Sequence, residues 1–508
     1  MSRFKRTFLT LALLTFTGIS GWTAALAANA KNPNSELIIA QQTDAKTLDP
    51  SMTTDVYSQN LTLQIYDRLF DWTADVKLEN NLAESYKQVD PLTLQVKIKK
   101  GVKFHNGDEL TAEDVKFSLE RASKSGAVSS FMAIVDKVDI VDPYTVNIVT
   151  KKPFGPLVGN LAHGSGAILN KKYVEGNPDK AFFEPVGTGP FRFDSWKAGD
   201  RITLKANKEY FRGAPGVDSV VFRVIPEGTN RSIALETKEV DVVFAIYPVD
   251  TDIVRSKDYL VLHEVPSLST TYIGINFNKK PLSDLRVREA LAYGIDLQSI
   301  ADTAYQKAAI VADSFVPPAV MGVNKDLKYR KRDVAKAKTL LTEAGYKDGL
   351  DLKIWVNENP ARKDAAVIMQ DQLKEVGINL SVETLEWSSY LDRISKGEHD
   401  LFILGWPTSP DPNETMYPIF HSSNFGFGGN RSFYKNERVD ELLDKGSETL
   451  DIDARIPLYQ EAQKIVYDDL AVLPILYPSD FMGTQKYISG FEPTPRSVFL
   501  IRNVKKNK

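Results

Sequence analysis

Residues 351–404 alternate between the patterns of a strand and of a helix, and this alternation constrains the fold more than any other feature. Strand-like apolar runs cover 351–356, 378–385 and 399–404, with a helical pattern in each interval. The first helical pattern stops at Gly377, a residue type that often ends helices. Three strands joined by two helices over short connections are typical of a parallel, doubly wound sheet. We therefore predict an α/β fold.

The Gly-Trp segment, residues 405–413, follows the third of these strands directly and reads Gly-Trp-Pro-Thr-Ser-Pro-Asp-Pro-Asn. In open α/β sheets, ligands bind beyond the carboxyl ends of the strands. We therefore expect this segment to form a loop that holds a small molecule. Trp406 would be a wall of the site, because an indole offers apolar area with a polar edge, although it could equally belong to the core.

The first 27 residues have the three parts of a signal peptide that is cleaved during export. Three basic residues precede an apolar stretch at 7–16, and the Ala-Leu-Ala at 25–27 provides a small-x-small cleavage site. A membrane span needs about 20 apolar residues, so this stretch is too short to be an anchor.

The chain contains no cysteine, and so it lacks the residue that carries the lipid of a bacterial lipoprotein. An exported binding protein without a lipid tether would need a closed compartment, which favours the periplasm. The formal net charge is −3, and residues 1–27 carry three basic and no acidic side chains, so the remainder has a net charge of −6. Nucleic-acid-binding chains normally have a basic surplus, and we expect no nucleic acid partner here.

The sequence has none of the common catalytic motifs. It contains no Gly-x-Ser-x-Gly elbow, no His-Glu-x-x-His motif and no cysteine nucleophile. The five histidines are scattered, and only His421 lies close to the Gly-Trp segment. A metal site usually needs several ligands that converge. We therefore predict a binding protein and not an enzyme, with no catalytic residue, cofactor or resident metal.

Three blocks of the sequence resemble one known family. In these blocks the chain is similar to the extracytoplasmic solute-binding proteins of family 5, which serve peptide ABC importers and include peptide-, glutathione-, nickel- and haem-binding proteins. The resemblance covers nearly the whole mature chain. The blocks are 99–107 with 110–115, then 272–278 with Pro281, Asp284 and 286–291, and finally 405–406 with 430–434.

The resemblance implies a two-lobed periplasmic-binding-protein fold of type II, cluster C, with an extra subdomain and hinge strands. The lobes would close on the ligand by hinge motion. The two strands that cross between the lobes would lie near 269–277 and 476–484. The expected parts are a signal peptide at 1–27, lobe 1 at 28–268 and 485–508 with a subdomain inserted at about 53–184, and lobe 2 at 269–484.

The same resemblance implies the function. We expect a monomeric periplasmic protein that captures short peptides and delivers them to the permease of an ABC importer in the inner membrane. The ligand would be a dipeptide, an oligopeptide or a glutathione-like peptide. The alternative is a carrier of a nickel complex or of haem with the same fold.

In peptide-binding relatives, the fifth residue of the Gly-Trp segment is an aspartate that pairs with the amino terminus of the ligand. Here that residue is Ser409, and the nearest carboxylate is Asp411. Either Asp411 pairs with the ammonium, which is costly to bury alone, or the amine is held as in glutathione-type relatives. Asp411 could also be a turn residue between two prolines. We count Thr408 of the same loop among the candidate ligand contacts.

A peptide carboxylate needs a cation, and a guanidinium can bind it through two hydrogen bonds. Arg362 follows the strand at 351–356, and Arg431 is the second candidate, although either could be a solvated surface charge. From the other lobe, Thr43 and Asp44 follow a predicted strand at 37–40 and would face the ligand. Ordinary turn chemistry explains these two residues equally well.

Overall fold

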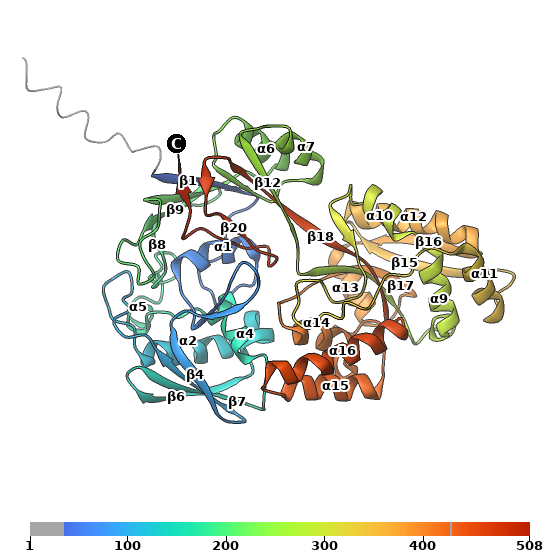
Figure 1. Ribbon diagram of the computed structural model, residues 1–508, viewed down its shortest axis with the longest axis horizontal. Coiled ribbons are helices and arrows are strands. Elements are labelled where there is room, and N and C mark those ends of the chain that lie inside the picture. The colour runs from blue at the N-terminus through green and yellow to red at the C-terminus, as the bar shows by residue number, and fades with distance from the viewer. Residues whose placement is uncertain (1–34, 427–428, 508) are drawn as a thin grey trace, which may run out of the picture.

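The computed structural model describes residues 35–426 and 429–507, and Figure 1 shows two lobes joined by strands that pass from one to the other. The predicted signal peptide at 1–27 lies outside the described residues. Within the described ranges, no helix combines the length and the apolar character that a membrane crossing requires.

Lobe 1 is built on one end of a 12-stranded mixed sheet. β1 (Glu36–Gln41) pairs in parallel with β10 (Ser219–Val224) and β11 (Val242–Phe244). β9 (Arg201–Ala206) and β8 (Phe191–Lys197) extend the sheet in antiparallel pairing. The inner faces of these strands and of the nearby C-terminal segment form one apolar core.

A separate four-stranded antiparallel sheet belongs to the inserted subdomain, in the order β4 (Ala83–Asp90), β5 (Thr93–Ile98), β7 (Thr145–Thr150), β6 (Val135–Asp142). Helix α2 (Ala112–Ser123) packs against this sheet, and a capping box formed by Thr111 and Asp114 marks its start. In this capping box, an Asp114 carboxylate oxygen accepts a hydrogen bond from the Thr111 backbone N–H at 3.0 Å. The subdomain has a hydrophobic core of its own, which lies inside the predicted range of 53–184.

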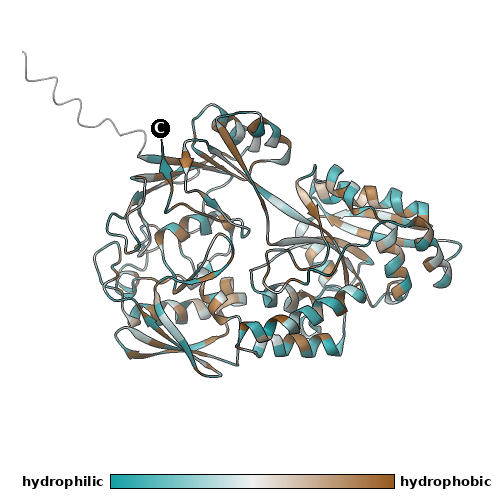
Figure 2. Ribbon diagram, viewed as in Figure 1, coloured by the Kyte–Doolittle hydropathy of each residue, from teal (hydrophilic) through white to brown (hydrophobic). Residues whose placement is uncertain are grey.

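Lobe 2 contains the predicted parallel unit. β15 (Leu350–Asn357) lies between β16 (Ile378–Leu385) and β17 (Leu401–Pro407) and is parallel to both. Helices α12 (Pro360–Val376) and α13 (Trp387–Ser395) connect them, and Gly377 ends α12 in the left-handed conformation at φ 95°. The α/β prediction for this segment is confirmed. Figure 2 shows apolar and polar colours alternating along the helices of this lobe.

The third strand of this unit is longer than predicted. The sequence pattern placed the strand at 399–404 and the loop at 405–413, whereas β17 continues through Gly405 and Trp406 to Pro407. The extension arises because these residues pair with β13 (Ser269–Ile275), a distant neighbour that local periodicity does not reveal. The loop itself is therefore only 408–411, and helix α14 (Pro412–Phe420) follows it.

One long strand joins the lobes. β18 (Val472–Gln485) pairs through its first half with β13 and β14 (Ala309–Val311), and through its second half with β11 and β12 (Leu260–Pro266). The chain passes from β12 to β13 through residues 267 and 268, beside the same stretch of β18. Figure 1 shows β18 running from one lobe to the other. The crossing strands thus lie close to the predicted positions 269–277 and 476–484, while the exact lobe limits stay a prediction.

The other helices and strands complete the two lobes and the subdomain. The helices are α1 (Val56–Ile65), α3 (Ser129–Met132), α4 (Leu157–Leu161), α5 (Lys171–Gly176), α6 (Gly228–Glu236), α7 (Thr251–Arg255), α8 (Lys280–Ser283), α9 (Leu285–Gly294), α10 (Leu297–Thr303), α11 (Val334–Glu343), α15 (Glu437–Glu448) and α16 (Ile452–Asp468). The strands are β2 (Phe70–Trp72), β3 (Leu78–Asn80), β19 (Ile488–Ser489), β20 (Glu492–Pro493), β21 (Phe499–Leu500) and β22 (Lys505–Lys506).

Candidate functional site

Arg362 lies against the carboxyl end of β17, as expected for a residue that follows β15. It sits in the first turn of α12, where the side chain of Asn359 caps the helix by accepting from the Arg362 backbone N–H at 3.0 Å. Its Nη1 donates to Asn357 Oδ1 at 2.9 Å. A Cβ on Gly405 would stand 2.9 Å from Arg362 Nη2, so the glycine makes room for the guanidinium.

The charge of Arg431 affects the pKa of the same two buried tyrosines as the charge of Arg362 does. Burial raises the pKa of Tyr272 to about 12, and the charges of Arg431 and Arg362 oppose this rise. Burial also raises the pKa of Tyr390, again against the charges of both arginines. Arg431 Nε donates to Ser395 Oγ at 3.1 Å. Within the described residues neither guanidinium forms an ion pair, so two cations without carboxylate partners lie in one region.

Asp411 is engaged inside the protein. Its two carboxylate oxygens accept from Nη1 and Nη2 of Arg455, both at 2.8 Å, and the two side chains are only 4% and 2% exposed. One of these oxygens also accepts from the Asn413 backbone N–H at 2.9 Å and caps α14. A ligand ammonium would have to compete with Arg455 for this carboxylate. The geometry favours the structural interpretation of Asp411, and its contact with a ligand stays a prediction.

Glu414 is a candidate that the sequence analysis missed. It lies in the first turn of α14, is partly buried, and has no cationic partner among the residues that the structure describes. Trp406 Nε1 donates to its backbone carbonyl at 3.2 Å, which places the indole over this turn. Burial, and then the charge of Asp411, raise the pKa of Glu414 to about 8. Arg455 already forms an ion pair with Asp411. Glu414 is therefore the carboxyl group of this cluster that has no ion pair among the described residues.

Glu414 lies one residue beyond the Gly-Trp segment at 405–413, within which the sequence predicted the partner of the ligand ammonium. An acid in the first turn of a helix normally reads as a partner of the helix dipole, which is why its local pattern suggested no binding role. Its significance arises from Arg455, which belongs to α16 and already holds the neighbouring carboxylate.

The two remaining candidates of the loop shape the backbone. Thr408 donates its N–H to the Leu268 carbonyl at 2.8 Å, and its hydroxyl lies 2.7 Å from the hydroxyl of Thr415. Ser409 Oγ accepts from the Asp411 N–H at 3.2 Å. These bonds hold the loop against the crossing between β12 and β13.

In lobe 1, Asp44 has turn contacts. Its carboxylate accepts from Trp196 Nε1 at 3.0 Å and from the backbone N–H groups of Gly199 at 2.8 Å and Ala45 at 2.9 Å. It thus ties the end of β1 to the turn between β8 and β9. Thr43 is exposed, and its carbonyl accepts from the Gln41 side chain. Turn chemistry accounts for both residues, and their role toward a ligand is untested.

His421 is also held by internal contacts. Its ring stacks on Tyr417 with centroids 4.4 Å apart, Nδ1 lies 2.7 Å from Ser423 Oγ, and Nε2 lies 3.3 Å from an Asp444 oxygen. Over the described ranges, no group of three or more His, Cys, Asp or Glu side chains could hold a metal ion.

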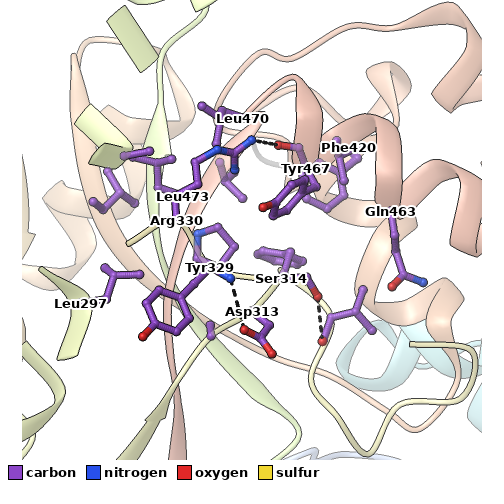
Figure 3. A pocket seen from close by; sticks show the side chains of 18 of the residues that line it. Leu297, Asp313, Ser314, Tyr329, Arg330, Phe420, Gln463, Tyr467, Leu470 and Leu473 are labelled. Carbon is purple, nitrogen blue, oxygen red and sulfur yellow. Dashed lines mark hydrogen bonds between the residues drawn. The ribbon is translucent and has the colours of Figure 1, made fainter. Parts of the chain in front are cut away.

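An apolar cavity lies elsewhere in lobe 2, beside β13 and the ends of β18 and α16 (Figure 3). Its volume is about 50 Å³, far below the roughly 300–1,000 Å³ of small-molecule sites. Arg330 stacks on Tyr467 at its wall, with the guanidinium carbon 4.3 Å from the ring centroid. Neither Arg362, Trp406 nor Glu414 lines this cavity, so it is distinct from the region of the unpaired charges.

The raised pKa of Glu414 gives a testable dependence of stability on pH. Between its usual value of 4.5 and about 8, the folded protein holds a proton that the unfolded chain has released. The free energy of unfolding contributed by this group therefore falls as the pH rises through that interval. We expect Glu414→Gln to gain stability relative to the native protein from pH 5 to pH 8, measured by urea unfolding.

The matched control for this measurement is Glu437→Gln, in the exposed first turn of α15. A stability difference between Glu414→Gln and the native protein that stays constant from pH 5 to pH 8 would contradict the expectation, because it would mean that the carboxyl is ionised throughout.

Two lobes, strands that cross between them, and unpaired charges at the carboxyl ends of β15 and β17 define the class of hinged solute-binding proteins. Residues 77–427 match the family model described as "Bacterial extracellular solute-binding proteins, family 5 Middle". The chain belongs to this family. Its relatives in the family are binding proteins of transport systems and not enzymes.

Curated relatives cover most of the chain. The dipeptide-binding protein of Escherichia coli K12 is 30% identical over 87% of this chain and 88% of its own length. The glutathione-binding protein GsiB of Escherichia coli O1:K1 / APEC is 30% identical over 94% of this chain and 96% of its own.

Solved structures show the same fold. HbpA2 from Haemophilus parasuis is 28% identical with a TM-score of 0.88, covering 93% of this chain and 99% of that protein. The periplasmic binding protein DppA from Helicobacter pylori, solved with the peptide STSA, is 28% identical with a TM-score of 0.75, covering 93% and 98%. The predicted family and two-lobed fold are confirmed.

Proposed function

We propose that the protein is a periplasmic receptor of an ABC importer that captures short peptides with a free amine and a free carboxylate. As a monomer, it would close its lobes on the peptide by hinge motion and present it to the permease in the inner membrane. Support comes from the family and from relatives whose names state dipeptide or glutathione binding.

One observation carries the ligand assignment. Arg362 and Arg431 offer guanidinium groups, and Glu414 offers a carboxyl group, without ion-pair partners among the described residues. A buried or partly buried guanidinium is costly without a partner, and a ligand ammonium beside Glu414 would favour the ionised form of its carboxyl, so a complementary ligand would be bound by these groups. A zwitterionic peptide has the required pair of charges, with its carboxylate suited to the arginines and its ammonium to Glu414.

Trp406 connects the two ends of this arrangement. Its indole bonds to the Glu414 carbonyl, while its neighbour Gly405 lies against Arg362. The indole is partly exposed and would supply an apolar wall for the peptide. Glu414 would then replace the aspartate that peptide-binding relatives have at the position of Ser409, and Asp411 would keep its pairing with Arg455.

Both peptide branches suit this arrangement. A glutathione-like peptide has an additional carboxylate, which a second arginine could bind. A simple dipeptide or oligopeptide needs one arginine and Glu414. No observation in the described residues favours the nickel-complex or haem alternative. NikA from Staphylococcus aureus is structurally similar but 23% identical, so this similarity supports the fold alone.

A ligand panel tests the proposal. The mature chain from residue 28 would be unfolded and refolded to remove bound ligand, then heated with dipeptides, tripeptides, longer peptides, reduced and oxidised glutathione, nickel complexes and haem. A ligand at about 100 times its Kd adds roughly 2.7 kcal/mol to the free energy of unfolding, enough for a clear upward shift of Tm. We expect shifts with peptides or glutathione, and a smaller shift with the same peptide after N-acetylation.

The N-acetylated peptide serves as the internal control, because it has lost only the ammonium. Shifts confined to haem or nickel complexes would contradict the peptide proposal. Equal shifts for free and acetylated peptides would leave the amine without a role and remove the assignment of Glu414.

A further inference from the structure

Arg496 lies on a loop that contacts the passage between the lobes. This loop connects β20 to β21, and Figure 1 shows it extending from lobe 1 toward lobe 2. The carbonyl of Pro495 accepts from the Leu268 N–H at 2.7 Å, and the Leu268 carbonyl accepts from the Thr408 N–H at 2.8 Å. Two hydrogen bonds therefore connect the neighbour of Arg496 to the loop at 408–411.

The loop also contacts the other crossing strand. Ser497, the residue after Arg496, donates from its hydroxyl to an Asp480 carboxylate oxygen on β18. The Arg496 N–H donates to Thr494 Oγ1 at 3.3 Å, which closes a tight turn. The backbone of Arg496 is thus fixed beside both crossings, while its side chain takes no part in these contacts.

The guanidinium of Arg496 has no hydrogen-bond or ion-pair partner within 35–426 and 429–507. The ion pairs formed by the charged groups around it do not include it, and the nearby Asp67 accepts only from the neutral side chains of Asn81, Thr188 and Tyr210. Arg68 pairs with Asp71, and Arg212 pairs with Glu79 at 2.7 Å and lies 3.5 Å from Asp71. Among the described residues, Arg496 is therefore the arginine of this group that has no ion pair.

The electrostatic surroundings agree with this arrangement. Burial, and then the like charge of Arg68, lower the pKa of Arg496 to about 10. Burial, and then the charge of Arg496, lower the pKa of the nearby His163 to about 3. The side chain of Arg496 nevertheless remains partly exposed, so an anion from outside the protein can reach it.

We infer that Arg496 binds an acidic group of the ligand from lobe 1, so that the protein prefers peptides with a carboxylate in addition to the terminal one. This inference rests on the proposed function. Arg362 lies on lobe 2 just beyond the carboxyl end of β15, and Arg431 lies on the same lobe beside the end of α13, whereas Arg496 lies on a loop of the opposite lobe. A ligand with two carboxylates would be held from both lobes, and this contact would stabilise the closed form.

Matched peptides that differ only in this charge provide the test. Ala-Glu and Ala-Gln, together with Ala-Glu-Ala and Ala-Gln-Ala, would be titrated calorimetrically into the native protein and into Arg496→Gln. A hydrogen bond to a charged group is worth enough for about a tenfold change in affinity. We expect the native protein to prefer the Glu peptide of a pair by about tenfold, and Arg496→Gln to lose this preference while binding the Gln peptide as before.

Arg192→Gln is the matched control, because Arg192 is an exposed arginine on β8 of the same lobe. It should keep the preference for the Glu peptide. The thermal midpoint of ligand-free Arg496→Gln should equal or exceed that of the native protein, because no internal partner is lost. A lower midpoint would indicate a structural role and overturn the inference.

The titrations distinguish failure of this inference from failure of the proposed function on which it rests. Equal affinity of the native protein for Glu and Gln peptides would overturn the role of Arg496 and leave the proposed function intact. An equal loss of affinity for both peptides in Arg496→Gln would also overturn the role of Arg496 and leave the proposed function intact. Such a loss is expected if Arg496 turns toward Asp480 when the lobes close. Failure of every peptide to bind would overturn both.

Discussion

Replacing Arg455 by methionine is expected to lower the free energy of unfolding by about 3–5 kcal/mol, because it leaves the buried Asp411 carboxylate without its partner. Both side chains are almost fully enclosed, and the guanidinium donates to both carboxylate oxygens at 2.8 Å. Arg455 Nε also donates to the Gly446 carbonyl at 2.9 Å. Urea unfolding at neutral pH would measure the loss.

The location of the Asp411–Arg455 pair adds to the expected loss of stability. A Cβ on Gly155 would stand 2.8 Å from Arg455 Cδ, and the Gly155 N–H donates to the Ser447 carbonyl at 2.8 Å. Gly155 belongs to the subdomain inserted in lobe 1, so Arg455 packs where that subdomain meets lobe 2. Its loss would therefore loosen a second contact between the lobes.

Arg438→Met is the control for Arg455→Met. Arg438 pairs with Glu461 at 2.9 Å and with Glu441 at 3.2 Å, but its side chain is 54% exposed. Surface pairs of this kind contribute about 0–1 kcal/mol. Losses of similar size in the two variants would mean that the Asp411–Arg455 pair contributes no more than a surface contact.

Replacing Arg362 by alanine is expected to weaken peptide binding by about 30-fold or more. Truncating one partner of a desolvated, hydrogen-bonded charge pair typically costs about 2–5 kcal/mol of binding free energy. The fold should change little, because within the part of the chain that the structure describes the side chain of Arg362 hydrogen-bonds only to Asn357, a neutral acceptor. Calorimetric titration with the peptide that gives the largest thermal shift would measure the Kd.

Peptide amidation identifies the group that Arg362 contacts. A C-terminal amide should bind the native protein about as weakly as the free acid binds Arg362→Ala, and amidation should matter little in the variant. This is the coupling expected of two groups in direct contact. Arg438→Ala should bind both peptides like the native protein. Independent, additive losses from amidation and from Arg362→Ala would place the carboxylate elsewhere.

Much of lobe 2 could be predicted because its local patterns are strong. The strands and helices of 351–404 follow from periodicity and from the helix-ending Gly377, and the parallel pairing of β15 with β16 and β17 follows from the connections. The length of β17 could not be predicted in the same way. Its last residues are a strand because β13 pairs with them, and β13 lies more than 100 residues earlier in the chain.

The sequence indicates where a candidate site lies, but not which of its charged groups have partners. Arg362 and Trp406 were located from the rule that ligands bind beyond strand ends, and the structure brings them together through Gly405. Asp411 and Glu414 show the limit of this reasoning. Both are acids at the start of α14, and only the position of Arg455 on α16 distinguishes the paired carboxylate from the unpaired one.

The sequence by itself determined the family, the α/β unit and the absence of disulfide bonds, because each is written in short-range patterns or in composition. Only the tertiary structure decided which charged side chains have partners inside the protein. Partnership is a matter of a few ångströms between residues far apart in the chain, such as Asp411 with Arg455, 44 positions away. That Arg362, Arg431, Glu414 and Arg496 have no ion-pair partner among the described residues therefore becomes apparent only in the folded chain, where the other charged groups have been paired.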